Sequence, residues 1–123
     1  QTAMCFGFQC EDGWFDIIYD LSKKISEICP ECEAMCVKQK FASLRFYVDN
    51  SSNEVEELTS LAGDESLKTC EICGSKDKVI VIKAAWMESL CKSCRKKEYP
   101  YYYLKLFISR FLRPFRKIFV QFS

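Results

Sequence analysis

The stretch from Cys70 to Cys94, CEICGSKDKVIVIKAAWMESLCKSC, begins and ends with a Cys-x-x-Cys pair. Two intervening residues let both thiolates of a tight turn face one ion, and Gly74 permits the left-handed backbone that such a turn often requires. Four thiolates fill a tetrahedral site and leave no open position. We therefore expect Cys70, Cys73, Cys91 and Cys94 to bind one structural Zn²⁺, with rubredoxin-like iron or free, redox-active thiols as the alternatives.

The composition of the whole chain fits a metal-stapled domain. Its 123 residues include nine cysteines and no histidine. The odd cysteine count, the lack of a visible secretory leader and the paired spacing favour an intracellular metal site over a disulfide scaffold, so we expect a reduced, cytoplasmic protein. Without histidine, Ser-His and Cys-His catalysis are unavailable. A chain of this length is only marginally stabilised by burial, which a metal would supplement.

A third Cys-x-x-Cys pair, Cys29 and Cys32, lies near the middle of the first half. With Cys10 and Cys36, or with Cys5, this pair can hold a second zinc ion. The alternative is that these side chains are small buried apolar groups, as free cysteines commonly are.

Upstream of the metal stretch, the apolar pattern predicts helix, β-hairpin, helix. Helical spacing over residues 13–28 predicts the first helix, with Asp12 as its N-cap. Alternation over residues 34–48 predicts two strands joined by Phe41-Ala42-Ser43. A second helix is expected over residues 54–68, with Asn53 and Glu56 as a capping-box-like start.

These elements define the expected architecture. Residues 1–98 form a single α+β domain of helix, antiparallel β-hairpin and helix, followed by a four-cysteine zinc-ribbon or treble-clef-like module over residues 70–94. A short apolar strand is expected over residues 79–82, between the two cysteine pairs. Residues 99–123 form a basic, aromatic, helical tail.

Charge is distributed unevenly along the chain. Residues 1–66 carry 5 basic and 13 acidic side chains, whereas residues 67–123 carry 13 basic and 4 acidic. A basic half of this kind suits an anionic partner such as nucleic acid, although ordinary solvated faces are the alternative. The candidate contacts with nucleic acid or another partner lie on the hairpin, after the second cysteine pair and in the tail: Lys38, Lys40, Arg45, Tyr47, Lys92, Arg95, Lys96, Lys97, Arg110, Arg113, Arg116 and Lys117.

The tail also carries many apolar groups, which would form a large patch if they were left in water. We therefore expect residues 99–123 to pack on a protein partner, on a copy of the chain or on the chain's own core. Binding to an anionic membrane surface is a weaker alternative.

Five segments form an ordered set over residues 5–94: Asp12-Gly13-Trp14-Phe15, Val37-Lys38-Gln39-Lys40-Phe41, Leu44-Arg45-Phe46-Tyr47, Thr69-Cys70-Glu71-x-Cys73-Gly74 and Trp86-x-x-x-Leu90-Cys91-x-x-Cys94. The set resembles an uncharacterised family of small zinc-knuckle proteins from bacteria and their phages. In that family, glycine usually occupies the position of Ala42, and the tail lies outside the shared pattern. The resemblance implies a compact zinc-containing domain in a bacterial or phage setting, and no particular substrate.

The functional expectation is binding rather than catalysis. We expect a non-catalytic, zinc-stabilised binding module that acts through protein–protein contacts, as an inhibitor or an assembly subunit. A nucleic-acid-binding zinc ribbon is the alternative, and no small-molecule substrate is evident. Asp12, Asp16 and Asp20 share one helical face and suggest a magnesium site, but acidic residues at a helix N-terminus are commonly explained by the helix dipole alone.

Overall fold

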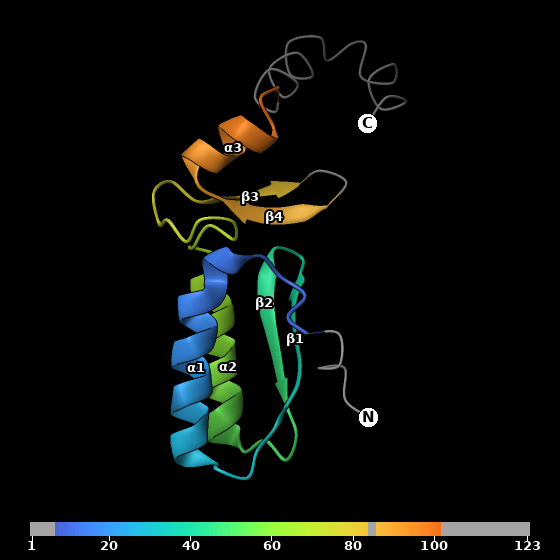
Figure 1. Ribbon diagram of the computed structural model, residues 1–123, viewed down its shortest axis with the longest axis vertical. Coiled ribbons are helices and arrows are strands. Elements are labelled where there is room, and N and C mark those ends of the chain that lie inside the picture. The colour runs from blue at the N-terminus through green and yellow to red at the C-terminus, as the bar shows by residue number, and fades with distance from the viewer. Residues whose placement is uncertain (1–6, 84–85, 102–123) are drawn as a thin grey trace.

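The computed structural model describes residues 7–83 and 86–101, and these form two stacked parts (Figure 1). In the first part, two helices lie side by side and a β-hairpin packs on them. The second part, a shorter hairpin followed by a helix, sits on the end of the first. The elements in chain order are η2 (Asp12–Trp14), α1 (Phe15–Ile28), β1 (Ala34–Lys40), β2 (Ser43–Val48), α2 (Asn53–Ser66), β3 (Ile80–Lys83), β4 (Met87–Leu90) and α3 (Lys92–Glu98). The α+β expectation is confirmed.

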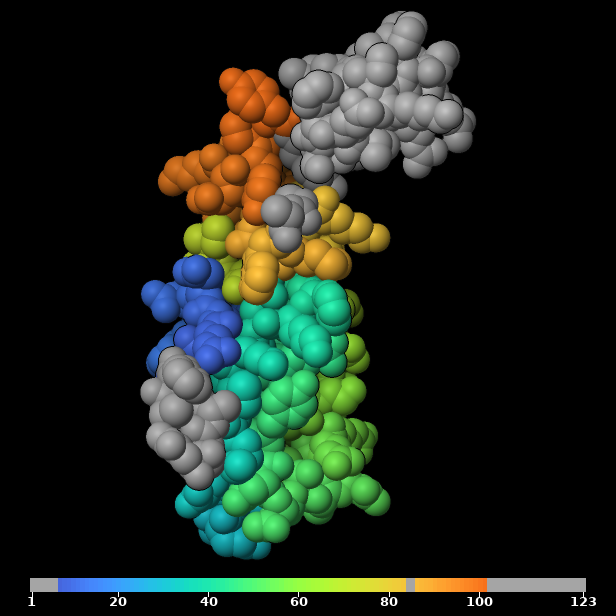
Figure 2. Space-filling model, turned by 90° about the vertical axis from the view of Figure 1, so that its right-hand side faces the viewer, coloured from blue at the N-terminus to red at the C-terminus, as the bar shows by residue number. Residues whose placement is uncertain are grey.

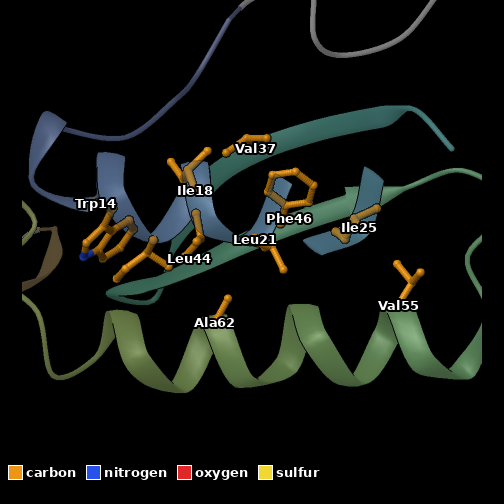
Figure 3. Close-up of a cluster of buried hydrophobic side chains, with 10 residues drawn as sticks. Trp14, Ile18, Leu21, Ile25, Val37, Leu44, Phe46, Val55 and Ala62 are labelled. Carbon is orange, nitrogen blue, oxygen red and sulfur yellow. The ribbon is translucent and has the colours of Figure 1, made fainter. Parts of the chain in front are cut away.

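The main core lies between the helix pair and the first hairpin (Figure 3). Helix α1 buries one face, and the hairpin turns alternate side chains inward, as period-two geometry requires. Fully burying an aliphatic or aromatic side chain of this size stabilises a fold by about 1.5–3 kcal/mol. The buried side chains are Trp14, Ile17, Ile18, Leu21, Ile25, Val37, Leu44, Phe46, Val55 and Ala62.

Both predicted helix starts are wrong in detail. Asp12 does not cap α1, because a 3-10 turn comes first and Trp14 stands at the N-cap without a side-chain bond. Helix α2 is capped one residue early, by Ser52, whose Oγ accepts the Val55 N–H at 3.3 Å. The reason at α1 is tertiary: contacts of the turn with residues 69–71, described below, fix its conformation.

The β1–β2 hairpin has a two-residue loop rather than a three-residue connection. Lys40 pairs with Ser43, and both loop residues have positive φ, 53° at Phe41 and 68° at Ala42. Two positive values define the type I′ turn, whose twist matches that of the strands. The Ala42 carbonyl accepts a 2.8 Å bond from Ser89 Oγ, so this turn also joins the first hairpin to the second.

Within residues 7–83 and 86–101, no helix has the length and apolar character needed to cross a membrane.

Candidate metal centre

Four cysteine thiols converge at the second part of the fold. The Sγ atoms of Cys70, Cys73, Cys91 and Cys94 all lie within 4.8 Å of one another, and the Sγ atoms of Cys73 and Cys91 are 3.6 Å apart. A tetrahedron of thiolates about 2.3 Å from a zinc ion has edges of about 3.8 Å. The four residues are thus already placed as the ligands of one tetrahedral ion.

Each pair is positioned by local backbone structure. In the first pair, the Cys70 N–H donates to the Ser75 carbonyl at 2.8 Å, and the Gly74 N–H donates to the Cys70 carbonyl at 2.9 Å. Gly74 has φ of +80°, which a residue with a Cβ adopts only with strain. In the second pair, Cys91 is the N-cap of α3 and its Sγ accepts the Cys94 N–H at 3.5 Å.

The short hairpin brings the two pairs together. Ile80 pairs with Leu90, so the chain enters and leaves the β3–β4 hairpin side by side. Ile82 and Leu90 are fully buried against Cys70 and form a small second core. A cysteine turn, a hairpin and a helix that begins at the second pair make up a treble-clef-like module, which is one of the two arrangements expected from the sequence.

The ionisation behaviour of the four thiols suits a bound cation. Burial works to raise the pKa of Cys70, but hydrogen bonds from the backbone of Cys73, Cys91 and Ile72 outweigh it and lower this pKa to about 7. At Cys94, burial and the neighbouring thiols, Cys70 foremost, raise the pKa. One thiolate therefore forms readily and opposes ionisation of its neighbours, and a bound dication would relieve that repulsion.

The module is joined to the first part at Gly13. The Gly13 N–H donates to the Glu71 carbonyl at 2.7 Å, and the fully buried Trp14 donates from Nε1 to the Thr69 carbonyl at 3.1 Å. A Cβ on Gly13 would lie 2.2 Å from the Cys70 carbonyl oxygen. The start of α1 therefore lies directly against the first cysteine pair.

A buried polar network crosses the same junction. Glu71 is only 4% exposed. Its carboxylate accepts bonds from Gln39 Nε2 and from the Glu11 N–H, each at 3.3 Å, and Gln39 also donates to the Met87 carbonyl. Burial, with Glu88 and Glu11 nearby, raises the pKa of Glu71. Sequence reasoning missed this network, although Gln39 occupies an inward position in the alternation of β1.

The predicted second zinc site is wrong as a four-residue set. Cys29 and Cys32 form a disulfide, whereas Cys10 and Cys36 are free, half-buried thiols. Cys10 precedes α1 in the chain and Cys29 follows it, and α1, with 14 residues, is about 21 Å long. Burial, followed by Glu71, also raises the pKa of Cys10 to about 11, which disfavours the thiolate that a metal needs. Cys5 lies outside the described residues.

The four candidate contact residues of the hairpin lie on one face, opposite the buried Val37, Leu44 and Phe46, because side chains alternate along the paired strands. Lys40, Arg45 and Tyr47 are exposed and Lys38 is half-buried. Lys38 Nζ lies 5.9 Å from the centre of the Tyr47 ring, and Lys38 is directly opposite Arg45 in the ladder.

The basic residues after the second cysteine pair differ in their exposure to solvent. Lys92, Lys96 and Lys97 are exposed on α3, but Arg95 is only 6% exposed. Arg95 Nη1 donates to the Leu90 carbonyl at 3.1 Å and to the Lys78 carbonyl. The expectation that Arg95 contacts a partner is therefore wrong, because its side chain is buried and bonds to two carbonyls within the module. Four predicted contacts lie outside the described residues: Arg110, Arg113, Arg116 and Lys117.

Asp12, Asp16 and Asp20 do not form a metal group. Among the described residues, the four cysteines are the one cluster of three or more side chains with ligand atoms close enough to share an ion.

Comparison of the chain with family models, curated proteins and solved structures finds no match.

Proposed function

We propose that this chain is a non-catalytic, zinc-stabilised module that binds a protein partner, as an inhibitor or an assembly subunit in a bacterial or phage setting. The observation that carries the proposal is the convergence of four thiols within 4.8 Å. A zinc ion held by four cysteines has no position left for a substrate or an activated water. The metal then contributes free energy of folding, and binding takes place on the protein surface that the metal stabilises.

That surface exposes several aromatic rings. Phe15 and Tyr19 stack on the outside of α1 with ring centres 6.3 Å apart, and they are 61% and 60% exposed. Phe41 and Trp86 extend from the two hairpin turns with similar exposure. Aromatic side chains are enriched at protein interfaces because they bury a large apolar area with few rotatable bonds. Their exposure supports binding through protein contacts.

The metal part of the proposal is tested on purified full-length protein. Elemental analysis should find one zinc per chain, and cobalt substitution should give the visible absorption bands of a tetrahedral thiolate site. Cys91→Ser should lose both signals, whereas the matched control Cys36→Ser should keep them. Protein without metal, or cobalt bands that survive Cys91→Ser, would overturn the assignment.

The binding part needs a separate experiment. Full-length protein and the Cys91→Ser variant are immobilised and exposed to lysate of the native host, and retained proteins are then re-tested in purified form. We expect a partner that binds the metal-loaded protein stoichiometrically and binds the variant weakly. Failure to retain any such protein, with metal content intact, would remove the protein-binding proposal and leave the zinc site standing.

A second candidate function, binding of nucleic acid, is favoured by one observation. Lys38 and Arg45 are cross-strand neighbours, and like charges in such a pair repel each other unless an anion lies between them. Tyr47 stands beside Lys38 and offers a ring on which a base can stack.

A labelled single-stranded oligonucleotide titrated at several salt concentrations tests this candidate. The double variant Lys38→Glu with Arg45→Glu should abolish binding. The control Lys23→Glu, at an exposed position of α1, should not. Affinity that does not change with salt would rule the candidate out.

A further inference from the structure

We propose that the free edge of β2 takes up an extended, basic peptide as an added strand, in the recess between β2 and α2. This inference rests on the proposed protein-binding function and identifies the surface and the class of partner.

The first step is the direction of the backbone groups along β2. The Leu44 N–H donates to Ser66 Oγ at 2.8 Å, and therefore points away from β1. On the paired strand, the N–H of Gln39 and the carbonyl of Val37 likewise turn outward and bond to Gln9, at 3.0 and 2.9 Å. Because direction alternates along a strand and Val37 pairs with Phe46, the N–H and C=O of Phe46 also point outward.

The second step is that the two edges of the hairpin differ. The segment around Gln9 covers the edge of β1 through a parallel bridge to Lys38. On β2, the last turn of α2 covers only the Leu44 end, where a Cβ on Gly63 would lie 3.3 Å from the Leu44 carbonyl. Among the described residues, no group bonds to the outward backbone of Phe46. An open strand edge is a template for pairing with another chain.

The third step is the recess beside that edge. A cavity of about 570 Å³ lies between β2 and α2, along the side of the hairpin where α2 appears in Figure 2. Phe46 and Val48 line it on the β2 side, and Thr59 and Ser60 line it on the α2 side. A strand that pairs with Phe46 would direct every second side chain into this recess, toward α2.

The fourth step is charge. Helix α2 carries five acidic side chains and no lysine or arginine, and of these acids only Glu65 has an ion-pair partner among the described residues, Lys76 at 3.4 Å. Glu56 and Asp64 are exposed and line the recess. They are eight residues apart, or about 12 Å along the helix. Side chains four residues apart in a strand are separated by about 13 Å.

These spacings define the occupant. It is an extended peptide of the form Lys-x-Val-x-Lys, whose valine lies opposite Phe46 and whose lysine at the Val48 end reaches Glu56. Because α2 covers the Leu44 end, the peptide leaves β2 there, and its second lysine reaches Asp64 from outside the strand ladder. Main-chain bonds to Phe46 would supply affinity, and the side-chain pattern would supply specificity, as in other cases of strand addition.

The probe is the fluorescein-labelled peptide Ser-Thr-Lys-Thr-Val-Thr-Lys-Thr-Ser, titrated with metal-loaded full-length protein and followed by anisotropy. We expect saturable binding, and slower amide hydrogen exchange at Phe46 in the complex. N-methylation of the backbone at the valine should weaken binding by about tenfold or more, because it removes a donor to the strand.

The protein variants test charge and position. Asp64→Lys should weaken binding about tenfold, whereas Glu57→Lys, the same charge change on an exposed residue outside the recess, should change it less than about twofold. A peptide with glutamate in place of both lysines should bind Asp64→Lys more tightly than it binds the original protein. Ser60→Trp should block the recess.

Three results would overturn the proposal. They are no saturation below about 1 mM protein, equal binding of the N-methylated peptide, and equal weakening by Glu57→Lys and Asp64→Lys. These results are distinguishable from failure of the proposed function. A purified protein partner that binds Asp64→Lys and Ser60→Trp normally would exclude the β2 edge and leave the zinc-stabilised module in place.

Discussion

Gly13 and Cys70 touch through their backbones, at the point where the first helix meets the first cysteine pair. A single added methyl group on Gly13 would lie 2.2 Å from the Cys70 carbonyl oxygen and 2.3 Å from that of Glu71. Both obstacles are backbone atoms of a turn that also carries Cys70 of the candidate metal centre, so neither can move aside without moving the thiol. The metal module and the helical part are thus one packed unit at this contact.

Gly13→Ala should therefore destabilise the protein by at least about 2 kcal/mol, since overpacking against backbone cannot be relieved by a rotamer change. Urea denaturation of the metal-loaded protein measures the effect. Ser22→Ala, on an exposed position of α1, is the control and should change stability by less than about 0.5 kcal/mol. Equal stability of the Gly13→Ala variant and the parent would contradict the packing described.

Removal of the metal should unfold residues 70–94 and loosen the junction. Chelation would leave four thiols without the ion that holds them together, and the bonds from Gly13 and Trp14 to residues 69–71 would lose their fixed acceptors. Hydrogen exchange should accelerate over residues 70–94 and at Gly13, while amides in the middle of α1, such as Leu21, should keep more of their protection. Unchanged exchange in residues 70–94 after chelation would refute the coupling of metal binding and folding.

Neighbouring basic residues of α3 should respond differently to substitution. Arg95 Nη1 donates to the Leu90 and Lys78 carbonyls inside the module, and the shorter lysine side chain would not place its ammonium at the same point. Arg95→Lys should cost about 2 kcal/mol or more of stability, whereas Lys96→Ala, at an exposed site, should cost less than about 0.5 kcal/mol. Thermal unfolding of the two variants measures this difference in stability. Equal midpoint temperatures would show that Arg95 is not a structural residue.

Tyr99 should titrate abnormally late. Its hydroxyl donates to Glu88 Oε2 at 2.6 Å, and this bond, with burial, raises its pKa from the usual 10 to about 12. Because the folded-state pKa is raised, the stability that the bond contributes is present below pH 10 and is lost as pH rises through 12. Ultraviolet titration of the parent minus Tyr99→Phe isolates this phenol. A difference curve centred near pH 10 would mean that the bond does not form in solution.

Much of the local structure follows from the sequence. The α1 and α2 periods, the alternation of the first hairpin and the two Cys-x-x-Cys turns are set by residues within four positions of one another, and the structure confirms them. Predictions at the ends of elements were wrong where contacts with residues distant in the sequence fix the local structure. Asp12 does not cap α1 because Gly13 and Trp14 are held by residues 69–71, and Arg95 turns inward because two carbonyls of the hairpin stretch accept its donors.

By itself, the sequence determined that two cysteine turns exist, since their spacing and glycine are local properties of the backbone. Their spacing also predicted that the four thiols share one ion. Only the tertiary structure decided that Cys29 and Cys32 pair with each other while Cys10 and Cys36 stay free, and that one edge of the first hairpin stays open beside an acidic helix. The physical reason is distance along the chain. Side-chain period and turn chemistry act over a few residues, whereas contacts between residues distant in the sequence depend on how whole helices and strands, about 20 Å long, pack together.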